Sequence, residues 1–233
     1  MIDDQRVLIM IPAWNEAASI GEVVAEIRGE LPETDVLVID DGSSDDTALA
    51  ARQSGAVVVR LPFNLGVGGA RRLGFRYAQA HGYQIAVQID ADGQHDPRYV
   101  PKLIDGLQEA SLVIGARFAG EGDYRAGGPR RWAMMLLSFV LSRMARQRLT
   151  DTTSGFRACD RSLIELFAQW YPVEYLGDTV ETTVRVLRLG YKVQQVPVAM
   201  RQRFGGTPSK SPVKALMYLG RAFFSLVLAV TRR

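Results

Sequence analysis

Two carboxylates stand one residue apart at the end of an apolar run. The run is Ile85–Ile89, and Asp90 and Asp92 follow it in the stretch IAVQIDADGQHDP. Burial stabilises an apolar strand but destabilises an unpaired carboxylate, so this arrangement needs a compensating partner. A hard divalent cation such as Mg²⁺ or Mn²⁺ would be one, because it takes oxygen ligands from carboxylates and substrate phosphates. The amide oxygen of Gln94 is a further candidate ligand, and Gly93 permits the turn that brings these groups together.

Two earlier apolar runs also end in polar residues. IPAWNE closes the first with Trp14 and Glu16, and VLVIDDGSSDDT closes the second with Asp41. Such carboxylates can accept hydrogen bonds from a base or a ribose, and Trp14 offers a flat apolar wall. Alone, the D-x-D pattern is equally typical of a solvated Asx turn before a helix. The two neighbouring loops favour a ligand site instead.

The loops follow strand-like runs that alternate with helical patterns. We expect strands at 7–12, 36–40, 57–61, 85–90 and 112–117, and helices at 17–30, from Ser43 or Ser44 to Gly55, at 69–81 and at 97–109. Continuous apolar runs followed by helices predict an α/β fold with a doubly wound, mostly parallel, Rossmann-like sheet. Ligands of such sheets bind beyond the carboxyl ends of the strands, where the polar loops collect.

Several classes of protein are excluded by composition and motif spacing. The stretch NLGVGGARRLGF has neither the spacing of a dinucleotide-binding loop nor a Walker lysine, which excludes a Rossmann dehydrogenase and a P-loop kinase. The single Cys159 excludes an intramolecular disulfide framework, and two histidines are too few for a His-rich metal site. The N-terminus carries acids where a signal peptide needs basic residues, so we expect a cytoplasmic protein.

Basic side chains gather in the second half of a chain whose formal net charge is +3. This asymmetry predicts an anionic partner, such as an acidic lipid surface or a phosphorylated substrate. The basic residues lack interleaved aromatic side chains, which argues against nucleic acid. The apolar, basic-flanked segments 131–149 and 212–231 are each either a core helix or a helix lying on lipid, and neither suits a membrane span. We expect a catalytic domain at 1–211 and an amphipathic, membrane-associating helix at 212–233.

Six motifs, in this order and spacing, resemble those of family 2 glycosyltransferases of the GT-A fold. They are VLIMIPAWNE, VLVIDDGSSDDT, NLGVGGARRLGF, VQIDADGQHDP, VIGARF and DTTSGFRA. The most similar branch is that of the polyprenyl-phosphate (dolichyl-phosphate) mannosyl- and glucosyltransferases. This resemblance covers almost the whole chain. It implies a metal-dependent, inverting transfer of a hexose from a nucleoside diphosphate sugar, of the GDP-mannose or UDP-glucose type, to polyprenyl phosphate.

The resemblance also implies a role for each matched residue. The nucleotide sugar is expected to contact Pro12, Trp14, Glu16, Ile39, Asp41, Asp90, Ala91 and Asp92, and the Mg²⁺ or Mn²⁺ cofactor to be held by Asp92 and Gln94. The acceptor phosphate is expected to face Arg117, with Arg131, Arg203 and Lys210 as further basic contacts. Asp151 matches an acid near the reaction centre, where it either joins Asp90, Asp92 and Arg117 in catalysis or orients an arginine.

Two other functions stay open on the sequence alone. A GT-A enzyme without a lipid acceptor would transfer sugar to a hydroxyl of a saccharide, protein or small molecule, with Asp178 or Glu181 as its base. An inactive subunit could instead bind a nucleotide sugar and recruit a membrane partner, although the complete set of metal and acceptor residues argues against this. The expected partners are a nucleoside diphosphate sugar, polyprenyl phosphate and the inner face of the membrane. The last helix could also dock on a second copy of the chain or on a small membrane protein.

Overall fold

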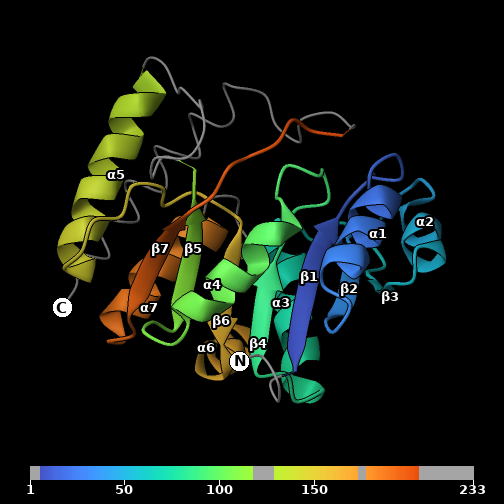
Figure 1. Ribbon diagram of the computed structural model, residues 1–233, viewed down its shortest axis with the longest axis horizontal. Coiled ribbons are helices and arrows are strands. Elements are labelled where there is room, and N and C mark those ends of the chain that lie inside the picture. The colour runs from blue at the N-terminus through green and yellow to red at the C-terminus, as the bar shows by residue number, and fades with distance from the viewer. Residues whose placement is uncertain (1–5, 118–128, 173–176, 205–233) are drawn as a thin grey trace.

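A seven-stranded sheet with helices on both faces forms the described part of the computed structural model, residues 6–117, 129–172 and 177–204 (Figure 1). The strands are β1 (Val7–Ala13), β2 (Asp35–Asp40), β3 (Val57–Arg60), β4 (Ile85–Gln88), β5 (Leu112–Ala116), β6 (Arg157–Asp160) and β7 (Val193–Pro197). The helices are α1 (Ile20–Glu30), α2 (Thr47–Gln53), α3 (Val67–Ala80), η1 (Pro97–Tyr99), α4 (Val100–Gly106), α5 (Pro129–Ala145), α6 (Arg161–Gln169), η2 (Gly177–Glu181) and α7 (Thr182–Arg188).

The strand order is β3-β2-β1-β4-β6-β5-β7, and only β6 runs antiparallel to its neighbours β4 and β5. The expected α/β fold with a mostly parallel sheet is therefore confirmed. The carboxyl ends of β1, β2, β4 and β5 share one edge of the sheet. Because β6 is reversed, its amino end lies at that same edge, and so does the loop before it. This reversal brings the DTTSGF motif to the loops after the parallel strands.

Two apolar layers cover the two faces of the sheet. One layer packs α1 and α4 on the sheet through residues such as Val24, Ile27 and Leu103. The other packs α3, α5, α6 and α7 on the opposite face through Phe75, Leu141 and Phe167 among others. Strand β1 is buried along nearly all its length, as its unbroken apolar run predicts for a central parallel strand.

Five elements of the second half were not expected from the sequence: α6, η2, α7, β6 and β7. Strand β6 has only four residues, and β7 reads Val-Gln-Gln-Val-Pro, so neither has an apolar run long enough to predict a strand. The helix expected at 131–149 ends earlier, at Ala145, because Arg146 adopts the left-handed backbone conformation that ends helices (φ 53°). The helix expected at 212–231 and the domain boundary at 211 lie outside the described residues.

Substitution of Phe75 on α3 tests how much the apolar layer under α3, α5, α6 and α7 contributes to the free energy of unfolding. The Phe75 ring is fully buried, with centroids 5.0 Å from Phe167 and 5.2 Å from Tyr171. We expect Phe75→Ala to lower the free energy of unfolding by about 3–5 kcal/mol in urea titrations, because the substitution leaves a cavity. Phe63→Ala, at a side chain that is 63% exposed, should change it by less than about 0.5 kcal/mol. Similar losses in both variants would contradict this core assignment.

Candidate active site

Hydrogen bonds fasten the loop after β1 to the loop after β2. The backbone N–H of Asn15 donates to Ser43 Oγ, and that of Ser44 donates to Asn15 Oδ1, both at 2.9 Å. The backbone N–H of Glu16 donates to Thr47 Oγ1, also at 2.9 Å. The expectation that Ser43 or Ser44 caps α2 is wrong, because the helix begins only at Thr47. The two serines instead hold Asn15, whose own backbone is left-handed (φ 54°).

The fastened loops present two carboxylates and an indole. Asp41 is buried, and its Oδ1 accepts the backbone N–H of Leu65 at 2.7 Å. Burial raises the pKa of both Asp41 and Glu16, and the Ser19 hydroxyl donates to Glu16 Oε2 at 3.0 Å. Trp14 is 47% exposed. Polar acceptors beside an exposed aromatic face can bind the edge and the face of a nucleoside.

His95 shapes the loop after β4. Its Nδ1 accepts the backbone N–H of Asp90 at 3.0 Å, and burial lowers its pKa, which favours the neutral ring that this bond requires. Gly93 turns the chain through the left-handed region (φ 78°), so that the backbone N–H of Gln94 donates to Asp92 Oδ1 at 3.0 Å. The side chain of Asp90 is 39% exposed, whereas that of Asp92 is 8% exposed.

Residues 198–204, which we call the strap, cross this loop after leaving β7 (Figure 1). The backbone N–H of Arg201 donates to the Gln94 carbonyl at 3.1 Å, and that of Phe204 donates to the Asp92 carbonyl at 3.0 Å. The Phe204 ring also lies against the backbone of the loop. The strap is thus bound to the D-x-D loop along its main chain.

Two arginines of the strap bind the carboxylates beneath it. Arg203 Nη2 is 2.7 Å from Asp92 Oδ2, and its Nη1 is 3.8 Å from Glu16 Oε1. Arg201 Nη2 lies 2.5 Å from Asp96 Oδ1. Burial alone would raise the pKa of Asp96, but hydrogen bonds from Arg98 and Arg201 lower it to about 2. Arg203 therefore joins the first loop to the D-x-D loop.

Arg117, directly after β5, forms a bidentate ion pair with Asp151. Arg117 Nε is 2.5 Å from Asp151 Oδ2, and Nη2 is 2.9 Å from Oδ1. Asp151 is fully buried, yet its pKa is lowered, because hydrogen bonds and charge from Arg117 outweigh the effect of burial. Thr153 Oγ1 accepts a further bond from Arg117 Nη2 at 3.0 Å. The ion pair with Asp151 thus fixes the plane of the Arg117 guanidinium.

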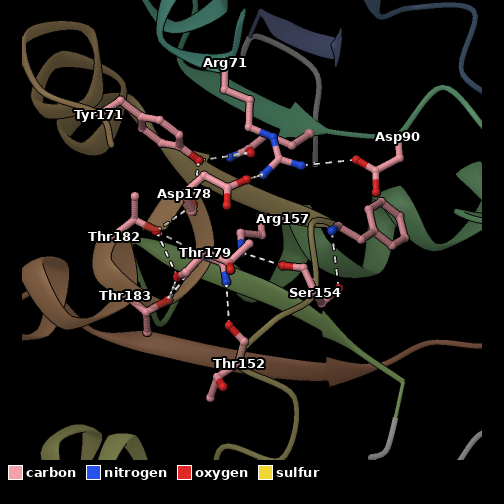
Figure 2. Close-up of polar contacts among 12 residues, drawn as sticks. Arg71, Asp90, Thr152, Ser154, Arg157, Tyr171, Asp178, Thr179, Thr182 and Thr183 are labelled. Atoms are coloured by element: carbon pink, nitrogen blue, oxygen red, sulfur yellow. Dashed lines mark hydrogen bonds and ion pairs between the residues drawn. The ribbon is translucent and has the colours of Figure 1, made fainter. Parts of the chain in front are cut away.

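A group of buried polar side chains, which includes Arg71, Arg157 and Asp178, lies next to Asp90 (Figure 2). Arg157 is 1% exposed, and each of its hydrogen bonds among the described residues goes to a neutral oxygen, including the carbonyls of Thr152, Ser154 and Thr179. Burial lowers the pKa of Arg157 to about 10. Next to it, Arg71 pairs with two carboxylates. Neither arginine was assigned a role from the sequence.

The structure brings most of the expected site residues to the same edge of the sheet. They are Trp14, Glu16, Asp41, Asp90, Ala91, Asp92, Gln94, Arg117, Asp151 and Arg203. Pro12 and Ile39 pair across β1 and β2, but the Ile39 side chain is buried against Gly74 of α3 and belongs to the core. Arg131 lies in the first turn of α5, where only the backbone is described, and Lys210 lies outside the described residues.

Comparison with known proteins assigns the chain to a family. Residues 8–167 match the model of glycosyl transferase family 2, which is well over half of the chain. The protein is a family 2 glycosyltransferase. This enzyme is 34% identical over 208 residues to an undecaprenyl-phosphate mannosyltransferase of Micrococcus luteus, covering 85% of this chain and 84% of that protein. It is 30% identical over 217 residues to a polyprenol monophosphomannose synthase of Mycolicibacterium smegmatis, covering 89% and 82%.

A solved structure confirms the GT-A fold of the glycosyltransferase. The glucosyl-3-phosphoglycerate synthase of Mycobacterium tuberculosis, crystallised with Mg²⁺ and UDP, superposes with a TM-score of 0.73. The match has 25% sequence identity and covers 98% of this chain and 80% of that one.

The sequence analysis overlooked three side chains that hold the glycosyltransferase site together: Arg71, His95 and Arg157. A signal existed for the first two, because Arg71 is the first arginine of the GGARR stretch and His95 stands three residues after the D-x-D motif. Arg157 follows the SGF triplet, but its neutral partners come from two separate segments, which a linear pattern does not reveal. Within the described residues, no three His, Cys, Asp or Glu side chains come together as a metal-binding group.

The Arg117–Asp151 pair predicts a specific pH dependence of stability. Because the pKa of Asp151 is lowered on folding, the pair stabilises the fold above the unfolded-state pKa of about 3.9 and loses this effect as the pH falls. In urea titrations at pH 6, Asp151→Asn should therefore be less stable than wild type by about 3–5 kcal/mol. This difference should shrink below about pH 4. A difference that stays constant down to pH 3, or one matched by Asp105→Asn on the exposed side of α4, would contradict the prediction.

Proposed function

We propose that this glycosyltransferase moves a hexose from a nucleoside diphosphate sugar to polyprenyl phosphate, with inversion at the anomeric carbon. The observation that carries the proposal is the 34% identity to an undecaprenyl-phosphate mannosyltransferase over most of both chains. The donor is of the GDP-mannose or UDP-glucose type. The geometry described above supports a binding role for each part of the site.

The donor side of the site comprises the loops after β1, β2 and β4. Trp14 offers its exposed ring to the base, while Glu16 and Asp41 supply acceptors for the base or the ribose. Asp90 and Ala91 follow β4 at the same edge and are proposed to face the sugar and the diphosphate. The hydrogen bonds through Asn15 hold the first two loops in one arrangement before the donor arrives, which lowers the conformational entropy lost on binding.

Asp92 and Gln94 fit a divalent cation, Mg²⁺ or Mn²⁺. Mg²⁺ is commonly bound by one or two carboxylates together with substrate phosphates, and here a carboxylate and an amide side chain share one turn. Asp92 Oδ2 already attracts a positive group, the guanidinium of Arg203 at 2.7 Å. A bound cation would offset the negative charge that develops on the departing diphosphate. The chain's own residues bind and orient the two substrates.

Arg117 is proposed to bind the acceptor phosphate. A guanidinium matches the oxygen atoms of a phosphate with parallel N–H donors, and Asp151 fixes its plane. A phosphate monoester is already anionic near neutral pH, so a strong general base is less necessary than it is for a sugar hydroxyl. Orientation of the two substrates then supplies much of the rate enhancement. Arg203 at the strap lies at the same edge of the site.

The outer surface of α5 supports association with a membrane. Met135, Leu136 and Phe139 are 53%, 44% and 64% exposed, and the exposed Arg143 and Arg146 follow them. Exposed apolar side chains next to arginines are typical of a helix lying in a lipid interface. Among the described helices, none combines the length and hydropathy that a membrane span requires. We propose peripheral attachment to the inner face of the membrane.

An acceptor hydroxyl is less compatible with the observed contacts. Asp178, one candidate base for such an enzyme, is 4% exposed and ion-paired with the buried Arg71. A base must reach the proton that it removes, and this pair turns the Asp178 carboxylate into the protein interior. Glu181, the other candidate, is exposed at the end of η2. The buried ion pair therefore argues against Asp178, one of the two candidate bases for a hydroxyl acceptor.

The cation site can be tested by Asp92→Asn. A neutral amide is a poorer ligand for a hard cation, so turnover should fall by at least about 100-fold. Mn²⁺ should also stop strengthening nucleoside diphosphate binding in calorimetry. Asp105→Asn makes the same chemical change at an exposed position of α4 and should leave both measurements unchanged. Full turnover of wild type in excess EDTA would contradict the role of the cation.

The acceptor is tested with radiolabelled GDP- and UDP-sugars, undecaprenyl phosphate and extraction of label into the lipid phase. We expect one donor to label the lipid. Arg117→Lys should then lower transfer by about tenfold or more, because an ammonium cannot reproduce two parallel donors. Donor affinity should stay unchanged in this variant.

Arg52→Lys, at an exposed position of α2, serves as the matched control for Arg117→Lys. Transfer at the wild-type rate by Arg117→Lys, or label only in water-soluble products, would contradict the lipid phosphate acceptor.

A further inference from the structure

Arg71 lies on α3 beneath the D-x-D loop, with 3% of its surface exposed. Its Nη1 pairs with Asp178 Oδ2, and its Nη2 is 3.1 Å from Asp90 Oδ1 (Figure 2). One guanidinium thus bridges a buried carboxylate and the partly exposed carboxylate that faces the donor side of the site. The planar, multi-donor guanidinium group permits this, whereas an ammonium is a single compact charge.

Asp178 is itself held in place from several directions. It stands in the π-helical turn η2, and its carbonyl accepts the Tyr171 hydroxyl and the Thr182 hydroxyl, both at 2.9 Å. The same turn is tied to the loop before β6 by Arg157, which donates to the Thr179 carbonyl at 3.0 Å. The Asp178 carboxylate therefore has little freedom, and π-helical turns often mark functional sites.

Gly155 leaves the space in which Arg71 and Asp90 meet. A Cβ atom at this position would lie 2.8 Å from Arg71 Nη2 and 3.2 Å and 3.3 Å from the two carboxylate oxygens of Asp90. Any side chain at position 155 would push the pair apart. The SGF triplet and the GGARR stretch, which lie on different elements, thus converge on the same carboxylate.

The Asp90 side chain has only part of its surface in contact with the protein. It is 39% exposed, and its Oδ2 is 3.7 Å from His95 Nε2, while Oδ1 takes Arg71. Without Arg71, rotation about the Asp90 side-chain bonds would let the carboxylate leave this orientation. A shift of about 1 Å in a substrate-positioning group can cost about 100-fold in rate.

We propose that Arg71, clamped by Asp178 and accommodated by Gly155, is a positioning residue that fixes the Asp90 carboxylate toward the donor sugar. This inference rests on the proposed function, because it requires that Asp90 faces the sugar. A positioning role for Arg71 differs from a purely structural role of the Arg71–Asp178 pair in one measurable respect. A positioning residue acts through Asp90, so its effect depends on whether Asp90 keeps its carboxylate.

The test is a double-mutant cycle with Arg71→Lys and Asp90→Asn. Two quantities are measured with the donor selected by the panel above: kcat, and the ratio of the Kd of the nucleoside diphosphate (GDP or UDP) to that of its sugar conjugate. In Arg71→Lys we expect kcat to fall by about 10- to 100-fold and the Kd ratio to fall with it. The Kd of the nucleoside diphosphate alone should stay within about twofold, since Arg71 does not face the nucleoside.

In the Asp90→Asn background, Arg71→Lys should change the Kd ratio by less than about twofold, because the carboxylate on which it acts is gone. Equal effects in both backgrounds would overturn the inference, as would a parallel loss of nucleoside diphosphate affinity. Arg72→Lys, at the exposed neighbouring position of α3, is the matched control and should behave as wild type.

Gly155→Ala tests the same geometry without changing any charge, in case Arg71→Lys does not fold. It should lower kcat and the Kd ratio in the same direction, and wild-type values in this variant would overturn the inference. A wild-type enzyme that uses none of the donors would instead contradict the proposed function itself. Donor use together with an additive cycle contradicts only the role of Arg71.

Discussion

Buried carboxylates at one edge of the sheet are the constraint on which the rest of this structure depends. They include those of Asp41, Asp92, Asp151 and Asp178, with Asp90 partly exposed beside them. An uncompensated buried charge costs several kcal/mol, so each carboxylate needs a partner inside the protein. Asp41 is stabilised by a backbone N–H, and the other four by guanidinium groups. The elements that supply those guanidinium groups therefore determine how the site is built.

The partners reach the site because three segments converge on the edge where β1, β2 and β4 end. Helix α3 supplies Arg71, the end of β5 supplies Arg117, and the strap after β7 supplies Arg203. The reversed strand β6 adds Asp151 and Gly155 from the loop that precedes it. A fully parallel sheet would place that loop at the opposite edge. One antiparallel strand thus gives the site both an acid that orients Arg117 and the space in which Arg71 meets Asp90.

The strap places a positive charge on the carboxylate that the proposed function assigns to a cation. Arg203 Nη2 is 2.7 Å from Asp92 Oδ2. An ionised carboxylate has about four lone-pair sites on its two oxygen atoms, so Asp92 can bind a cation and still accept a hydrogen bond from Arg203. Under the proposed function, a bound cation and Arg203 would share the Asp92 carboxylate. Arg203 is also one of the residues assigned to the acceptor phosphate. The cation site and the acceptor site would then be connected through a single side chain.

The first five strands and the polar loops after them were predictable from the sequence, since unbroken apolar runs and the turn residues that end them are local signals. The order of the motifs likewise identified the family and the candidate residues for each part of the site. The elements β6, α7 and β7 were not predictable, because they are short or mix polar and apolar residues. Helix α6 was overlooked, although Asp160 caps it and Leu163, Ile164 and Phe167 line one face at helical spacing. The role of Asp151 was open on the sequence alone.

The pairing of charges was decided only by the tertiary structure. Arg71 and Asp178 lie 107 positions apart, and Arg117 and Asp151 lie 34 apart, so no local pattern connects them. An arginine that pairs inside the protein and one that faces solvent look the same in a sequence. Their difference arises from burial, which raises the energetic cost of an unpaired charge and so makes each carboxylate depend on one particular guanidinium.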